Sequence, residues 1–197
     1  MGHVRCIMWK ALGAAFGLTF VADFGDKTQI AILTLASRYG FLSVFLGAAV
    51  AFVVMNGLAV TVGVLFARYV PKDVIRYVAA AIFIIAGVIS FLPVREEEEE
   101  REIMEKKKSR RPFVATIGLM ALLELGDKTQ LSLIALTSKL GYPFIIFIGG
   151  TLAMWATSLI GALAGKGISR AVPLKYIRWL SGVLFLVFGV LIAAGVF

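Results

Sequence analysis

Six stretches of mostly apolar residues divide the chain, and short polar or charged segments separate them. These stretches lie near residues 11–37, 41–67, 74–94, 113–138, 143–165 and 174–197. A helix of about 20 predominantly apolar residues is long enough to cross the roughly 30 Å hydrocarbon core of a bilayer. The pattern therefore predicts an all-α membrane protein with six transmembrane helices.

The composition supports this class. Apolar residues make up 60% of the chain, and the mean hydropathy of +0.93 exceeds what a soluble globule can bury. All five tyrosines fall near the ends of the proposed spans, as expected of interfacial aromatic residues. The first span shares a motif with an internal one, so we expect it to belong to the working protein and not to a cleaved signal peptide.

The net charge of +8 reflects topology more than a nucleic-acid partner, because Lys and Arg flank the apolar spans. Twelve of them lie in the odd-numbered loops, seven of these in 95–111, whereas six lie at the N-terminus and in the even-numbered loops. By the positive-inside rule, we expect the central loop to be cytoplasmic and both termini to be outside. No nucleic acid is expected to bind.

Charged residues also occur inside two of the apolar stretches. The segment ADFGDKTQIA spans residues 22–31, and LELGDKTQLS spans residues 123–132. Each charge at the bilayer centre costs about 2.5–3.5 kcal/mol even on the lenient insertion scale, so such charges are typically functional. At 100° per residue, the charges of each motif would form one polar stripe along a continuous helix.

The two motifs belong to an internal repeat. Residues 18–40 align with 119–141 without a gap, giving nine identities in 23 positions, and the match continues from 45–47 to 147–149. We therefore expect two three-helix repeats, 1–94 and 113–197, joined by a charged linker at 95–112. Because each repeat has an odd number of spans, the second must be inverted, an arrangement common in secondary transporters with a site near the midplane.

The motif residues predict a cation and proton site. Four carboxylates are expected to bind the metal or protons: Asp23, Asp26, Glu124 and Asp127. A supporting polar shell comprises Lys27, Thr28, Gln29, Lys128, Thr129 and Gln130. An alternative is a salt-bridge network in which the two lysines hold the carboxylates, but four acids against two lysines leave a net charge of −2. One divalent cation or two protons would neutralise it.

The ligand types indicate which ion would fit. Carboxylate, amide and hydroxyl oxygens suit Ca²⁺, Mn²⁺ or Mg²⁺ better than Zn²⁺ or Cu⁺. No prosthetic group is expected. Gly25 and Gly126 provide either close helix packing, the commoner role, or a kink that exposes backbone carbonyls. Four polar residues in other spans could complete the coordination, although such residues more often bond their own backbone: Asn56, Thr61, Thr157 and Ser158.

The linker REEEEEREIMEKKKSRR, residues 95–111, allows two interpretations. Its five adjacent glutamates could form a cytosolic metal sensor. Acid–base pairs at i,i+4 spacing, such as Glu97 with Arg101, instead favour a solvated helix that also fixes topology. The second interpretation is favoured because adjacent glutamates point around a helix and do not converge.

The doubled motif resembles the Gdt-one-type family of cation/proton exchangers in the lysine-exporter superfamily. The family marker is E-x-G-D-[KR]-[ST], and Glu124–Thr129 matches it in full. The first copy differs because Asp23 stands where the marker has Glu, which shortens the carboxylate arm by a methylene group. The resemblance implies exchange of Ca²⁺ or Mn²⁺ for protons and no enzymatic activity. The minimal six-span length favours a prokaryotic cell membrane.

Three other functions would leave different patterns in the sequence. An intramembrane aspartyl protease would carry G-x-G-D, but the first glycine is absent from both motifs. An exporter of an amino acid or other small organic solute should show aromatics and a counter-charge for a carboxylate. A passive divalent-cation channel could use the same acidic residues, and only coupling to a proton gradient would distinguish it.

Overall fold

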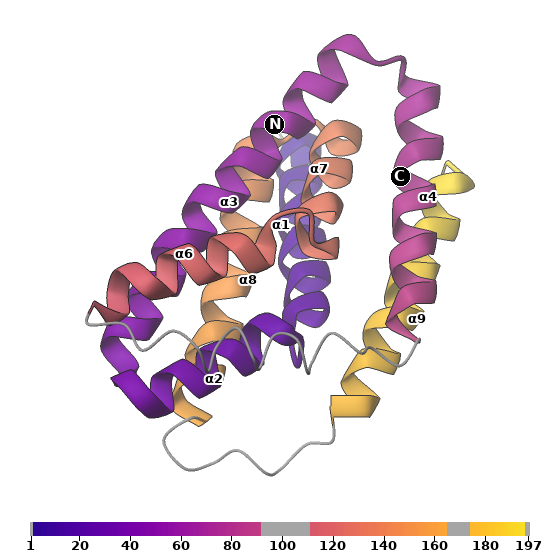
Figure 1. The fold of residues 1–197 in the computed structure, drawn as a ribbon. Coiled ribbons are helices and arrows are strands. Elements are labelled where there is room, and N and C mark those ends of the chain that lie inside the picture. The colour runs from indigo at the N-terminus through magenta and orange to yellow at the C-terminus, as the bar shows by residue number, and fades with distance from the viewer. Residues whose placement is uncertain (1, 92–110, 165–173, 196–197) are drawn as a thin grey trace.

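A computed structural model describes residues 2–91, 111–164 and 174–195, and the regular structure in these ranges is entirely α-helical (Figure 1). The all-α class is therefore confirmed for the described residues. Of the charged segment 95–111, only Arg111 lies inside these ranges. The helices are α1 (Gly2–Asp23), α2 (Lys27–Tyr39), α3 (Phe41–Tyr69), α4 (Lys72–Ser90), α6 (Pro112–Glu124), α7 (Lys128–Leu140), α8 (Pro143–Ala164) and α9 (Leu174–Ala193).

Both motifs interrupt a helix. The chain leaves α1 at Asp23 and enters α2 at Lys27, with Gly25 at a φ of +75°. Gly126, at +78°, makes the same break between α6 and α7. Because a left-handed residue cannot continue a right-handed helix, the predicted continuous spans 11–37 and 113–138 and their polar stripes are wrong.

In the described part of the chain, two helices are long and apolar enough to span a bilayer, judged by length and composition alone. They are α3 and residues Pro143–Leu163 of α8, while Pro112–Glu124 and Gly182–Ala193 are shorter apolar helices. The breaks at the two motifs divide two of the expected spans into shorter pieces. The count of six crossings therefore stays a prediction.

The helices of the two sequence repeats pack against each other more than within one repeat. The repeat alignment pairs α1 with α6, α2 with α7, α3 with α8 and α4 with α9. Helix α1 packs on α8, and its counterpart α6 packs on α3. Helix α3 also packs on α8, and α4 lies beside α9 along one edge of the molecule (Figure 1).

Two glycines mark equivalent close contacts between the halves. A Cβ added to Gly47 of α3 would lie 2.8 Å from the Phe113 carbonyl oxygen and 2.9 Å from Thr116 Cβ of α6. A Cβ added to Gly149 of α8 would lie 3.0 Å from the Leu12 carbonyl oxygen and 2.9 Å from Ala15 Cβ of α1. The same register therefore recurs at the α3–α6 and α8–α1 contacts.

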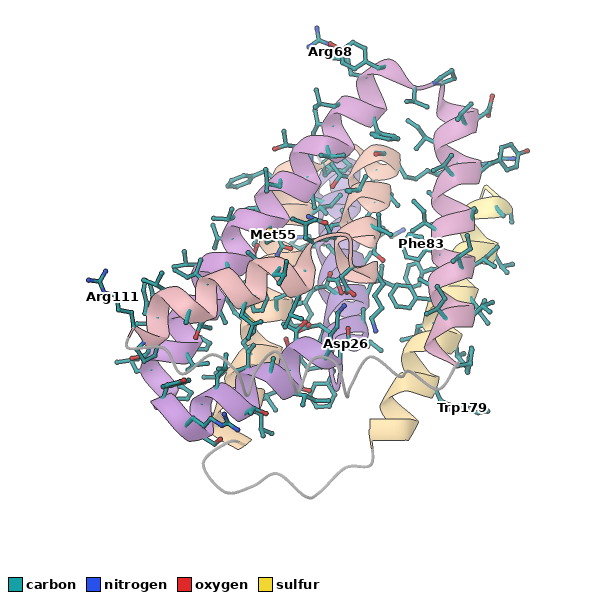
Figure 2. All side chains as sticks on the ribbon, viewed as in Figure 1. Asp26, Met55, Arg68, Phe83, Arg111 and Trp179 are labelled. Carbon is teal, nitrogen blue, oxygen red and sulfur yellow. The ribbon has the colours of Figure 1, made fainter. Side chains whose placement is uncertain are left out.

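Apolar residues fill the interior in two clusters. One contains Phe83, Phe185 and Leu133, and the other contains Phe52, Met120 and Met154. Figure 2 shows Asp26 between the helices, whereas Arg68 and Arg111 point outward at the periphery. Large apolar side chains also cover the outside, including Val54 and Leu58 of α3, which are 53% exposed each. Such a surface suits contact with lipid.

Candidate functional site

The two helix breaks are closed by the same hydrogen bonds. The Asp26 N–H donates to the Asp23 carbonyl at 3.2 Å, and the Asp127 N–H donates to the Glu124 carbonyl at 3.1 Å. The Gly25 N–H donates to Gln29 Oε1, and the Gly126 N–H donates to Gln130 Oε1 at 2.7 Å. These bonds satisfy backbone groups that the helices leave free, and they fix both motifs in one conformation.

The glycines therefore act as breaks, and the packing role expected as the commoner one is wrong for Gly126. A Cβ at Gly126 would meet nothing within 4 Å, so no close neighbour requires glycine there. Its positive φ does, since side chains are disfavoured in that conformation. Gly25 has the same positive φ and the same place between two helices.

Each break places two carboxylates at opposite helix ends. Asp23 and Glu124 are the last residues of α1 and α6, where the helix dipole is negative. Asp26 and Asp127 are the N-caps of α2 and α7, and the Asp127 side chain accepts a bond from the Thr129 N–H at 3.2 Å. A negative side chain at a negative helix end favours binding of a positive charge.

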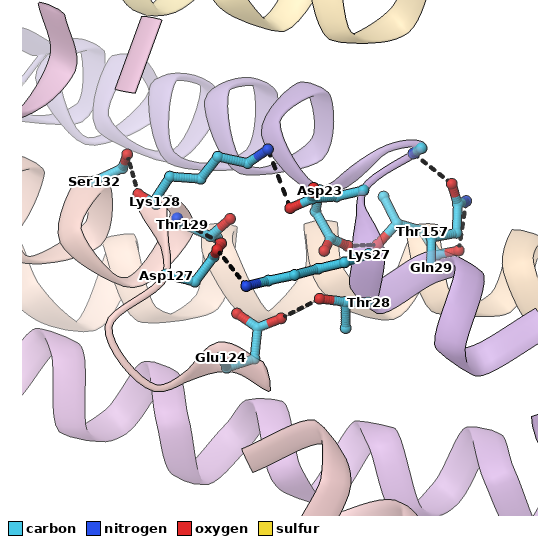
Figure 3. Close-up of polar contacts among 12 residues, drawn as sticks. Asp23, Lys27, Thr28, Gln29, Glu124, Asp127, Lys128, Thr129, Ser132 and Thr157 are labelled. Carbon is cyan, nitrogen blue, oxygen red and sulfur yellow. Dashed lines mark hydrogen bonds and ion pairs between the residues drawn. The ribbon is translucent and has the colours of Figure 1, made fainter. Parts of the chain in front are cut away.

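The two motifs are joined by reciprocal ion pairs (Figure 3). Lys27 Nζ lies 3.4 Å from Asp127 Oδ1, and Lys128 Nζ lies 3.1 Å from Asp26 Oδ2. Each lysine thus pairs with the aspartate of the other motif. The salt-bridge alternative is correct as far as these two pairs go, but the net charge of −2 over the four acids and two lysines remains.

The two remaining carboxylates accept hydroxyl hydrogen bonds from the opposite half (Figure 3). Thr28 Oγ1 donates to Glu124 Oε1 at 2.8 Å, and Thr157 Oγ1 of α8 donates to Asp23 Oδ2. Asp23 and Glu124 are each only 2% exposed. The two ion pairs and these two hydroxyl bonds therefore all cross the boundary between the halves, whereas the bond from the Thr129 N–H to Asp127 lies within one half.

Four polar residues outside the motifs were expected either to complete the site or to bond their own backbone. Thr61 and Ser158 bond backbone carbonyls one turn earlier in their helices, and Asn56 Nδ2 donates to Thr151 Oγ1 at 3.3 Å. Thr157 reaches a motif carboxylate. The sequence around Thr157 does not distinguish it from the neighbouring Ser158, which also carries a hydroxyl. Only the fold shows that Thr157 lies beside Asp23.

The assembled groups are hard oxygen donors around an excess of negative charge. Such a set suits Ca²⁺, Mn²⁺ or Mg²⁺. In the ranges that the structure describes, however, no three Asp, Glu, His or Cys side chains converge closely enough to hold a metal ion. The two lysines stand beside two of the acids instead, so metal ligation by the full set requires these pairs to open.

The chain matches a family model, and the match spans both repeats. The model is described as "Divalent cation/proton antiporter GDT1" and covers residues 11–98 and 112–196. The matched segments include both motifs and leave out residues 99–111 of the charged linker.

Curated relatives cover most of the chain at low to moderate identity. A Vibrio cholerae protein named "Putative manganese exporter" is 31% identical over 84% of this chain and 82% of its own. GDT1-like protein 5 of rice is 26% identical over 90% of this chain and 91% of its own. A GDT1-like protein of Synechocystis is 28% identical over 93% and 96%. No solved structure matches.

Proposed function

The chain belongs to the family of divalent cation/proton antiporters, and on that premise we propose that it exchanges Mn²⁺ or Ca²⁺ for protons at the two motifs. The observation that carries this proposal is the reciprocal pairing of Lys27 with Asp127 and of Lys128 with Asp26. It joins two charged motifs about a hundred residues apart into one polar centre. The chain is an integral membrane protein.

The charge of this centre provides the coupling. Four carboxylates and two lysines carry a net charge of −2, which one divalent cation or two protons would balance. Carboxylates must be deprotonated to ligate a metal, so binding of the cation and binding of protons exclude each other on the same oxygens. An antiporter needs this competition.

Asp23, Asp26, Glu124 and Asp127 are the proposed cation and proton ligands. The polar shell around them consists of Lys27, Thr28, Gln29, Lys128, Thr129 and Gln130. The lysines would hold Asp26 and Asp127 while no cation is bound, and would release them as ligands when it enters. Metal preference between Mn²⁺ and Ca²⁺ then depends on how many oxygens the opened site offers and how far apart they lie.

We also propose that the halves, 1–94 and 113–197, are inverted repeats of three spans each, joined by the linker 95–112. The matching contacts of Gly47 on α6 and of Gly149 on α1 support a two-fold relation between them. On this arrangement the central linker is cytoplasmic and both termini are outside, in a prokaryotic cell membrane. Thiol labelling tests this orientation: Gly2→Cys and Ser109→Cys, each made with Cys6→Ser, should react with an impermeant reagent from opposite sides.

Ion flux in proteoliposomes tests the proposed function. Vesicles loaded with a Ca²⁺/Mn²⁺ indicator are given a pH gradient, and the native protein is compared with Asp26→Asn and Asp127→Asn. We expect uptake that follows the gradient in the native protein and disappears in both variants. Ser37→Ala is the control, because its hydroxyl bonds the Thr34 carbonyl on an exposed part of α2.

The other outcomes separate the alternative functions. Cation flux that is independent of the pH gradient would indicate a passive channel. Absence of flux for both ions from intact protein would contradict cation transport and favour an exporter of a small organic solute.

A further inference from the structure

Thr157 is part of the first motif in space, although it lies on α8 in the other half of the chain. Its hydroxyl donates to Asp23 Oδ2, and its backbone carbonyl accepts a bond from Gln29 Nε2 at 3.2 Å. Thr157 and Asp23 are 0% and 2% exposed. Side chain and backbone of one residue are thus held by two residues of the motif.

The close approach of α8 to α2 explains this placement. Gly161 lies one helical turn after Thr157, on the same face of α8. A Cβ added to Gly161 would lie 2.9 Å from Gln29 Cγ and 3.2 Å from the Gln29 carbonyl oxygen. The absence of a side chain at Gly161 therefore lets α8 approach the start of α2 closely enough for Thr157 to reach Asp23.

The second half of the site is built differently. Glu124 Oε1 accepts its hydroxyl bond from Thr28, a motif residue, at 2.8 Å. The counterpart of Thr28 is Thr129, whose backbone N–H bonds Asp127. The counterpart of Thr157 in α3 is Met55, by the register that aligns 45–47 with 147–149. Methionine supplies no hydroxyl, and among the hydrogen bonds of the described residues a hydroxyl from outside the two motifs reaches Asp23 but not Glu124.

The two halves also differ in the length of the acidic side chain. Glu124 is one methylene longer than Asp23, and it reaches across to a hydroxyl of the opposite motif. Asp23 is shorter, and its partner hydroxyl comes from α8. Asp23 and Thr157 thus place a short carboxylate and a hydroxyl oxygen side by side.

We propose that Thr157 is a specificity-determining residue of the cation site, because it supplies a neutral oxygen beside the shortened carboxylate of Asp23. This inference rests on the proposed function of the two motifs. Ca²⁺ takes six to eight oxygen ligands at 2.3–2.6 Å, whereas sites for Mn²⁺ are typically octahedral with six. Loss of one neutral oxygen should therefore weaken Ca²⁺ binding more than Mn²⁺ binding.

The first test compares Thr157→Val with Thr157→Ser in the proteoliposome assay, using apparent affinities for Ca²⁺ and Mn²⁺. Loss of a group that supports a metal site typically lowers affinity about 10- to 100-fold. We expect Thr157→Val to lower the apparent Ca²⁺ affinity about tenfold and the Mn²⁺ affinity less than about threefold. Thr157→Ser, which keeps the hydroxyl, should retain the native ratio of Ca²⁺ to Mn²⁺ affinity.

Ser158→Ala is the matched control. Ser158 is equally buried on the same helix, and its hydroxyl bonds the Met154 carbonyl, as the Thr157 hydroxyl also does. Among the hydrogen bonds of the described residues, none joins Ser158 to a motif carboxylate. Its removal should leave the ratio of the two affinities unchanged. A ratio that shifts equally in Ser158→Ala would overturn the inference.

A second test uses the length of residue 23. Asp23→Glu extends the carboxylate into the space of the Thr157 side chain, so we expect it to lose transport. Asp23→Glu combined with Thr157→Ala makes room and should recover it, which is a coupling that independent sites would not show. Native transport by Asp23→Glu alone would overturn the inference.

The outcomes also separate this inference from the proposed function. If the native protein exchanges cations for protons but Thr157→Val leaves the Ca²⁺/Mn²⁺ ratio unchanged, the role of Thr157 is wrong and the exchanger stands. If Thr157→Val and Thr157→Ser both lower the apparent affinities for Ca²⁺ and Mn²⁺ by the same factor, Thr157 has only a structural role. If the native protein shows no gradient-driven flux, the proposed function fails, and the inference fails with it.

Discussion

Lys128 forms an ion pair with Asp26 across the boundary between the two halves, with 3.1 Å between Nζ and Oδ2. The equivalent residues, Lys27 and Asp127, form the equivalent pair at 3.4 Å. Each half thus neutralises one carboxylate of the other. The pairs are 11–24% exposed by side chain, so water screens them only partly.

A charge exchange tests the pair. Lys128→Asp would place two carboxylates face to face, and we expect it to lower the free energy of unfolding by about 2–4 kcal/mol, because a partly buried charge loses its partner. Lys128→Asp with Asp26→Lys restores opposite charges and should recover most of this loss. Thermal unfolding in detergent measures both. Equal instability of the single and double variants would contradict the pairing.

The helix break at the second motif should tolerate only glycine. Gly126→Ala is expected to cost about 1–2 kcal/mol of stability, since a side chain is disfavoured at a φ of +78°. Gly118→Ala in α6 is the matched control, because a Cβ at either position meets nothing within 4 Å. Gly118→Ala should be neutral or stabilise by about 0.5–1 kcal/mol. Similar losses in both variants would argue against a conformational cause.

The glycines at the contacts between halves should be sensitive for a different reason. Gly47→Ala would bring Cβ to 2.8 Å from the Phe113 carbonyl oxygen, and overpacking of this kind typically costs about 1–3 kcal/mol. Gly149→Ala should behave alike at its contact with α1. In Gly57→Ala the nearest atom would be 3.9 Å away, so melting temperatures should fall in the first two variants and not in the third.

The two glutamines should differ in importance. Gln29 holds the Gly25 N–H and also donates to the Thr157 carbonyl, whereas Gln130 holds the exposed Gly126 N–H. Loss of a partner for a buried polar group costs about 1–3 kcal/mol. Gln29→Leu should therefore reduce thermal stability more than Gln130→Leu. The reverse order would show that the link from Gln29 to α8 contributes little.

The sequence indicates which charged residues meet between the two halves, because charged residues are too costly in an apolar span to lie there without partners. The repeat alignment makes Asp26 the counterpart of Asp127 and Lys27 the counterpart of Lys128. That each aspartate pairs with the lysine of the other motif is shown by the fold and not by the alignment. The sequence does not show that the helices break, since Gly25 and Gly126 are compatible with a packed helix until the backbone is known. Thr157 could not be distinguished from Ser158, because the approach of α8 at Gly161 depends on tertiary packing.

The reciprocal contacts of α1 with α8 and of α6 with α3 give the molecule the architecture of a domain-swapped dimer within one polypeptide. Each half lays its first helix on the other half. A fragment that ends before the linker would lack α8 and α6. The face of α1 that packs on α8 and the face of α3 that packs on α6 would then be exposed. Two separately expressed fragments should therefore become stable only when they associate in the membrane, because each supplies the helices that cover the packing faces of the other.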